Sequence, residues 1–173
     1  MASYAFVRIP LGLYSETTYR FLPFLLTLAL ATLLLSSLSV LRQADFKAYI
    51  ALSSVGHMAM VTLGLASCCY DGVQGGILLS FAHGLVSPAL FIVLGGTLYD
   101  RYHSRTILYY RGIVLLLPLT ATFFFVASCM NMAVPPSPNW LAELLILTGL
   151  ISTSPLAAAL ASSGVVLSAA YTI

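Results

Sequence analysis

The sequence predicts an all-α integral membrane protein with about five transmembrane helices, one of them discontinuous. Hydrophobic residues make up 60% of the 173 residues and charged residues only 7%, whereas a soluble domain carries about 25% charged residues. The apolar residues gather in runs of about 20, the length that crosses the hydrocarbon core of a bilayer as a helix. A soluble globule of this length could not hide so much apolar surface from water.

Composition also excludes several kinds of binding site. The net charge of +2 is too small, and the basic residues too scattered, for a nucleic-acid-binding surface. The three cysteines, Cys68, Cys69 and Cys129, lack the spacing of metal ligands, and their odd number gives no disulfide framework. We expect them to be small apolar side chains near helix ends.

The first 20 residues predict an N-terminal arm that lies outside the bundle of spans at 21–173. Arg8 and Pro10 argue against a crossing here, and tyrosines suit the headgroup region because one end of the ring is apolar and the other is wet. The first span is predicted over 21–40, which contains no charge. Pro23 then lies in the first turn of the helix, where its missing N–H costs nothing.

The next two spans each carry a histidine near the middle. The span over 46–67 follows a charged turn in which Asp45 is the expected N-cap, accepting from free backbone N–H groups. It contains His57 among small and hydroxyl residues that let helices approach each other. The span over 75–98 contains His83 and, five residues later, a proline that should kink the helix or loosen its turn.

The fourth segment, 113–150, follows an aromatic and basic loop and is broken at 135–139 by three prolines. The break is either a loop outside the membrane or a discontinuity inside one crossing. Because only about eleven apolar residues follow it, too few to span alone, a single broken helix fits better. The fifth span is predicted over 155–173. Its expected packing face consists of small side chains, namely Ser162, Ser163 and Gly164.

Positive charges predict the orientation of the spans. They lie in the turn at 41–47 and in the loop at 99–112, which fall on the same side if each span crosses once. The opposite turn, around Asp71, has no Lys or Arg. The positive-inside rule places the two basic loops in the cytoplasm or the mitochondrial matrix. Arg8 and Arg20 fall on the other side and act against this orientation.

Three ionisable residues stand inside the apolar runs: His57, His83 and Glu143. Lys47, near one interface, lies roughly 15 Å from His57 along a helix, so His57 is expected near mid-membrane. An ionisable group at that depth indicates a functional site. Histidine titrates near neutral pH, and burial can raise the pKa of a glutamate toward it. The set therefore suits a water-linked proton pathway that includes Lys47. Two other roles stay open, a metal site or a set of hydrogen bonds between helices.

Ordered motifs over residues 41–145 resemble one family, the chain 4 subunits of mitochondrial NADH–ubiquinone oxidoreductase, respiratory complex I. The motifs are Leu-Arg-Gln-Ala-Asp-Phe-Lys at 41–47, Ala-Leu-Ser-Ser-Val-Gly-His-Met at 51–58, Ala-His-Gly-Leu at 82–85, Tyr-Asp-Arg-Tyr-His-Ser-Arg at 99–105, Pro135-Pro136 with Asn139, and Glu143-Leu144.

The resemblance implies an antiporter-like membrane subunit built from inverted repeats, of which this chain matches only the latter part. It implies that His57 and His83 lie on the central hydrophilic axis of the second half-channel. It also implies that 135–138 is the break in a discontinuous helix, and that Glu143 is the acidic residue of that helix. Glu143 is then expected near the matrix-facing or next-subunit-facing end of the proton path.

The resemblance further implies the partners and the location. The earlier helices of the family, with their lysine and glutamate, have no counterpart here, so either another polypeptide supplies them or the chain is partial. The chain is expected to be a subunit of a proton-translocating NADH:ubiquinone reductase with no redox or cofactor site of its own. NADH, FMN, iron–sulfur clusters and ubiquinone are expected in partner subunits. The other expected partners are membrane-arm subunits and lipids, in the mitochondrial inner membrane.

Two other functions stay open. The chain could belong to a related cation/proton antiporter that lacks redox partners, or it could be a non-conducting structural fragment of the helix bundle. The joint presence of His57, His83 and Glu143 argues against the fragment, because a purely structural helix could replace each of them at little cost.

Overall fold

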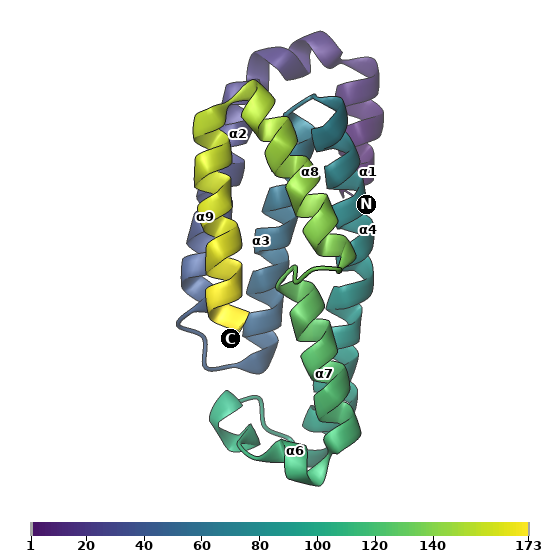
Figure 1. Ribbon diagram of the computed structural model, residues 1–173, viewed down its shortest axis with the longest axis vertical. Coiled ribbons are helices and arrows are strands. Elements are labelled where there is room, and N and C mark those ends of the chain that lie inside the picture. The colour runs from purple at the N-terminus through teal and green to yellow at the C-terminus, as the bar shows by residue number, and fades with distance from the viewer. Residues whose placement is uncertain (1, 173) are drawn as a thin grey trace.

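Long helices stand side by side in an up-and-down bundle (Figure 1). The computed structural model describes residues 2–172, and over this range it contains helices and connecting turns with one isolated bridge. Four helices are long and apolar enough to cross a membrane. They are α2 (Ser15–Val40), α3 (Phe46–Ala66), the continuous stretch Tyr70–Tyr102, and α9 (Pro155–Thr172). The stretch Tyr70–Tyr102 comprises α4 (Tyr70–Ile92), the π-helix η2 (Val93–Tyr99) and α5 (Asp100–Tyr102).

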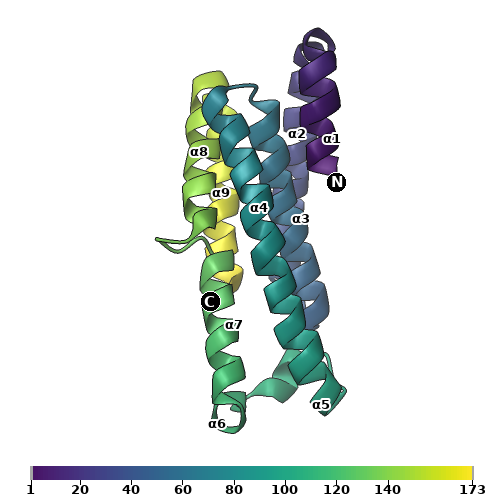
Figure 2. The same ribbon diagram turned by 90° about the vertical axis from the view of Figure 1, so that its right-hand side faces the viewer.

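The fourth crossing in chain order is made by two shorter helices, α7 (Pro118–Asn131) and α8 (Pro138–Thr153). With 14 and 16 residues, they are roughly 21 and 24 Å long, each less than the hydrocarbon core of about 30 Å. Figure 2 shows them nearly in line, with the break between them at mid-height. The predicted discontinuous crossing is therefore confirmed.

The two basic loops meet at one end of the bundle, as the charge pattern predicts. The backbone N–H of Phe46 donates to the carbonyl of Arg105 (2.9 Å), and that of Ile107 donates to Ala44 (3.0 Å). Asp45 occupies the N-cap position of α3, but its side chain makes no capping hydrogen bond. The expected capping hydrogen bond is therefore absent, and the carbonyl of Arg105 accepts from the first N–H of the helix instead. The loop itself contains a 3-10 turn, η3 (Ile107–Tyr110), and a short helix, α6 (Ile113–Leu116).

The N-terminal arm is helical, which the sequence did not predict. Its two short pieces are α1 (Ala2–Phe6) and the π-helix η1 (Val7–Leu11), and apolar side chains of both pack against the core. Figures 1 and 2 show the arm rising along the bundle before the chain turns into α2. Helix α2 begins at Ser15, so Pro23 lies inside it rather than in its first turn. The apolar run marks where the membrane begins, whereas the helix extends beyond it.

The turn between α3 and α4 is shorter than predicted, because α4 begins at Tyr70 rather than near residue 75. Pro88 lies inside α4, and the looser π-helical winding starts at Val93, about one turn further on. Cys68 and Cys69 occupy the turn as free, half-buried thiols near helix ends, as expected. Burial raises the pKa of the Cys68 thiol.

The packing face of α9 was predicted wrongly for its serines. Ser162 and Ser163 are exposed, and only Gly164 of the predicted set is buried. The buried residues follow helical spacing: Ala157, Ala158, Ala161, Gly164 and Ser168. Consecutive residues point in different directions around a helix, whereas residues three or four apart share a face. The predicted end of this span, Ile173, lies outside the described residues.

Glycines set the contacts of α4 with α3 and α8. A Cβ atom added to Gly149 would lie 2.6 Å from the backbone nitrogen of Gly72, and one added to Gly75 would lie 2.8 Å from the carbonyl oxygen of Ala142. A Cβ on Gly64 would lie 2.8 Å from the carbonyl oxygen of Gly72. Small residues at such crossings let helix backbones approach closely in membranes, and here they fix the register of α4 against α8.

Candidate functional site

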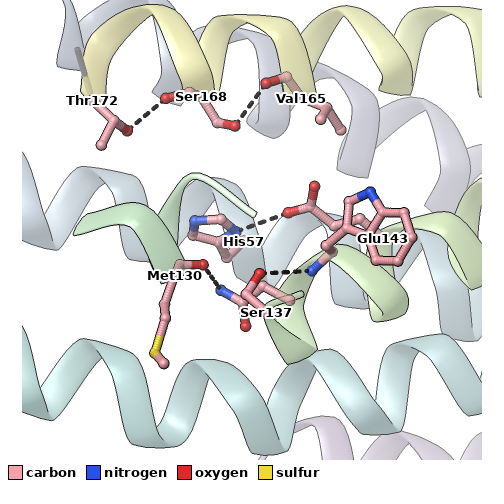
Figure 3. A network of polar contacts seen from close by, with 9 residues as sticks. His57, Met130, Ser137, Glu143, Val165, Ser168 and Thr172 are labelled. Carbon is pink, nitrogen blue, oxygen red and sulfur yellow. Dashed lines mark hydrogen bonds and ion pairs between the residues drawn. The ribbon is translucent and has the colours of Figure 1, made fainter. Parts of the chain in front are cut away.

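The three predicted ionisable residues come together in the middle of the bundle. His57 comes from α3, His83 from α4 and Glu143 from α8, and they are only 4%, 7% and 4% exposed. The Nδ1 atom of His57 lies 3.6 Å from Oε1 of Glu143, and the two histidine rings are 5.2 Å apart between centroids. Figure 3 shows His57 facing Glu143. The residues therefore form a row in the order His83, His57, Glu143.

The break in the fourth crossing explains how Glu143 reaches this depth. His57 lies eleven residues after Phe46, roughly 16 Å into the bundle. Helix α8 begins inside the bundle at Pro138, so its second turn, which carries Glu143, lies at the level of His57. The contact places Glu143 beside His57 at mid-depth, rather than near one end of the bundle.

The contact between His57 and Glu143 is electrostatic. The separation of 3.6 Å is too long for a hydrogen bond, so His57 and Glu143 attract each other only as an ion pair. With an effective dielectric constant of about 20, opposite charges at this distance attract by about 4–5 kcal/mol. Like charges on two neighbouring imidazoles repel each other. The row therefore suits the passage of a single proton.

Each member of the row has one polar atom without a protein hydrogen-bond partner among residues 2–172: His57 Nε2, His83 Nδ1 and Glu143 Oε2. Buried polar atoms are normally paired with protein or water. A cavity beside His57 and Glu143 leaves about 10 Å³ for the centre of a water molecule, which is room for about one water. The described side chains form no group of three or more His, Cys, Asp or Glu suited to a metal ion.

Hydroxyl groups complete the lining of this cavity, and the sequence reasoning missed them. Ser36 and Ser37 come from α2, and Ser168 and Tyr171 come from α9. The sequence did contain a signal for two of them, because Ser36 and Ser37 are adjacent hydroxyl residues in a leucine-rich span. A polar side chain in an apolar helix usually faces protein rather than lipid.

Lys47 does not join the row. It is exposed at the start of α3 and lines a different cavity of about 280 Å³ near the basic end, together with Tyr99 and Arg105. The guanidinium carbon of Arg105 lies 5.1 Å from the centre of the Tyr99 ring. About ten residues of α3, roughly 15 Å, separate Lys47 from His57.

The break is held by a buried amide that the sequence reasoning also missed. Asn139 is 0% exposed, and its Nδ2 donates to the carbonyl of Met130 across the break (2.9 Å). Ser137 caps α8 by accepting from the backbone N–H of Trp140 (3.3 Å), and Figure 3 shows both contacts below Glu143. The sequence signal for this role was the position of Asn139, an amide in the first turn of an apolar helix, directly after the prolines.

Comparisons with known proteins agree with one another. The family described as "NADH:quinone oxidoreductase/Mrp antiporter, TM" matches residues 1–168. NADH-ubiquinone oxidoreductase chain 4 of Mycosarcoma maydis is 52% identical over 173 residues, 100% of this chain and 36% of that protein. Chain 4 of Candida albicans (strain SC5314 / ATCC MYA-2876) is 41% identical over 171 residues, 99% of this chain and 37% of that protein.

The fold is similar to a solved structure, respiratory complex I from Thermus thermophilus with bound NADH. The TM-score is 0.92 at 32% sequence identity, and the match covers 98% of this chain and 36% of that chain. The chain thus spans about a third of the length of the relatives that it matches.

Proposed function

The chain belongs to the transmembrane family of NADH:quinone oxidoreductases and Mrp antiporters, and from this membership we propose that it contributes part of a proton-translocation half-channel to the membrane arm of respiratory complex I. The observation that carries the proposal is the buried row His83, His57 and Glu143, with a 3.6 Å contact between its last two members. Ionisable groups at mid-membrane commonly mark proton relays.

The row passes one proton at a time. A proton on Nδ1 of His57 moves to Oε1 of Glu143 when the 3.6 Å gap closes to hydrogen-bond length, about 2.6–3.2 Å. His57 then takes a proton from the side of His83. A change of charge elsewhere in the assembly drives the transfer, because it favours protonation at one end of the row.

The remaining partners follow from the part of the fold that this chain supplies. We expect other membrane-arm subunits and lipids. Electron transfer from NADH to ubiquinone, with FMN and iron–sulfur clusters, takes place on partner subunits, and this chain binds none of these groups. The location is the mitochondrial inner membrane, with the basic loops in the matrix.

A native separation of detergent-solubilised membranes, followed by mass spectrometry, tests this assignment. We expect the chain in a very large assembly that contains flavin and iron–sulfur subunits. A small complex without redox subunits would instead support the second candidate, a cation/proton antiporter, which the name of the matched family also covers.

Lys47 is proposed as an outer residue of the same pathway. Its ammonium group lies on the basic end, at the start of the helix that carries His57, so it would tune how readily protons approach the row. We expect Lys47→Met to lower coupled proton pumping by roughly three- to tenfold, about 1 kcal/mol in the barrier, without loss of assembly. Lys47→Arg should keep most of the rate. If both variants pumped at the unmodified rate, Lys47 would not belong to the pathway.

A further inference from the structure

We propose that the cavity at the basic end of the bundle binds the headgroup of an anionic phospholipid, with the phosphate between Lys47 and Arg105. This cavity of about 280 Å³, here called the basic cavity, is close in size to the smallest ligand sites, about 300 Å³. The glycerol of the lipid and the start of its acyl chains lie against the apolar part of the cavity. The inference concerns a site apart from the proton row and does not depend on proton transfer.

The two cations come from distant segments whose backbones are hydrogen-bonded to each other. Lys47 lies in the first turn of α3, and Arg105 lies in the loop that follows α5. The backbone N–H of Phe46 donates to the carbonyl of Arg105 (2.9 Å), and Asp45 and Thr106 form an isolated bridge. These backbone contacts hold both cations at one cavity, so the site does not depend on flexible side chains alone.

The charges of Lys47 and Arg105 have no carboxylate partner in the part of the chain that the structure describes. Neither side chain forms an ion pair there, and both are exposed. The acidic residues nearest to them in sequence, Asp45 and Asp100, do not line the cavity. Neighbouring positive charges at a bilayer surface attract the phosphate of an anionic lipid, and basic pockets between membrane helices bind such headgroups.

The side chains around the two cations are suited to a phosphate group at headgroup level. The guanidinium carbon of Arg105 lies 5.1 Å from the centre of the Tyr99 ring, and this cation–π contact steadies the arginine. Its N–H groups can then donate to two phosphate oxygens at once. Ser104 also lines the cavity, and its Oγ accepts from the backbone N–H of Thr106 (3.4 Å), so its own hydroxyl hydrogen can be donated to the ligand.

The rest of the basic cavity is apolar, and this part distinguishes a phospholipid from free phosphate. It is lined by Phe91, Leu94 and Gly95. A Cβ atom added to Gly95 would meet nothing within 4 Å, so the glycine leaves open space. Phe91 precedes Tyr99 by eight residues, roughly 12 Å along a helix, so the apolar part extends from the headgroup level toward the hydrocarbon core. Free phosphate makes no use of this surface, whereas a lipid covers it.

Photolabelling of the whole assembly, delipidated in mild detergent, tests the site. The probe is phosphatidylglycerol with a photoreactive group near the start of one acyl chain, and the comparison probe is phosphatidylcholine with the same chain and no net charge. Mass spectrometry locates the label on residues 91–95. We expect the phosphatidylglycerol probe to label this segment at least about fivefold more. Excess inorganic phosphate at constant ionic strength should reduce this labelling by less than about twofold, because it lacks the apolar contacts.

Two pairs of variants test the cations and the apolar part separately, with Lys47 left unchanged because it also belongs to the proposed proton pathway. Arg105→Gln should lower the labelling about fivefold, the effect of one cation near a membrane surface. Arg101→Gln is its control, since Arg101 is exposed but does not line the cavity. Gly95→Leu should fill the apolar part and lower the labelling as strongly. Gly96→Leu is its control, because Gly96 also has open space around it but lies outside the cavity.

Four results would overturn the inference. Equal labelling by the two lipid probes would mean that the charge of the headgroup is not recognised. Strong competition by inorganic phosphate would assign the cavity to a soluble anion, and no label on 91–95 from either probe would mean that another polypeptide covers it. Equal losses in the variants and their controls would show that the cavity residues have no particular role. Because labelling is measured without pumping, none of these results bears on the proton row.

Discussion

We expect glutamine in place of Glu143 to lower coupled proton pumping strongly while the assembly still forms. Glutamine has the same shape as glutamate but cannot take up a proton, so the row ends at His57. The side chain is 6% exposed and lies 3.6 Å from His57, where a neutral amide can still pack and hydrogen-bond. We expect pumping to fall at least tenfold, equivalent to about 1.4 kcal/mol or more in the barrier, measured in sealed vesicles driven by NADH.

The same change at Glu16 is the matched control. Glu16 is exposed in the first turn of α2, far in sequence from the row, and Glu16→Gln should leave pumping and assembly unchanged. Normal pumping by Glu143→Gln would exclude Glu143 from the pathway. A variant that fails to assemble, with no separate loss of pumping in the complexes that do form, would indicate the non-conducting structural role.

The sequence predicted the members of the row but not their contact. Each residue was recognisable because it is ionisable and lies well inside an apolar run. Whether His57 meets Glu143 depends on how α3 and α8 pack, and that packing depends on particular small residues. A Cβ atom on Gly64 of α3 would lie 2.8 Å from Ile146 of α8. Hydropathy gives the depth of a residue but not the register between helices that are distant in sequence.

The helix boundaries were also only partly predictable from hydropathy. The apolar runs marked the five crossings and the proline-rich break, because a membrane imposes length and composition on each span. The helical structure of the N-terminal arm and the true start of α2 were missed, since nothing outside the membrane requires an apolar pattern. Asp45 occupies the N-cap position that its residue type predicted, but its side chain makes no capping hydrogen bond. The contact between the two loops, in which Arg105 accepts from the first N–H of α3, could not be predicted from local sequence.

Alanine in place of Gly75 is expected to destabilise the bundle through a single added methyl group. The new Cβ would lie 2.8 Å from the carbonyl oxygen of Ala142 and 2.8 Å from the nitrogen of Ile146. Both are backbone atoms, so no side chain can move aside and α8 must shift as a whole. Overpacking of this kind costs about 1–3 kcal/mol. We expect less assembled complex after mild heating in detergent, measured on native gels.

Gly75→Ala is also expected to affect proton transfer, because α8 carries Glu143. A shift of α8 away from α4 changes the 3.6 Å separation between Glu143 and His57, and a misplacement of about 1 Å can lower a rate by roughly a hundredfold. The complexes of Gly75→Ala that survive should therefore pump poorly. Gly84→Ala is the control on the same helix, since its Cβ would meet nothing within 4 Å. If both variants were equally stable and active, the close crossing of α4 and α8 would not be what holds the proton row in place.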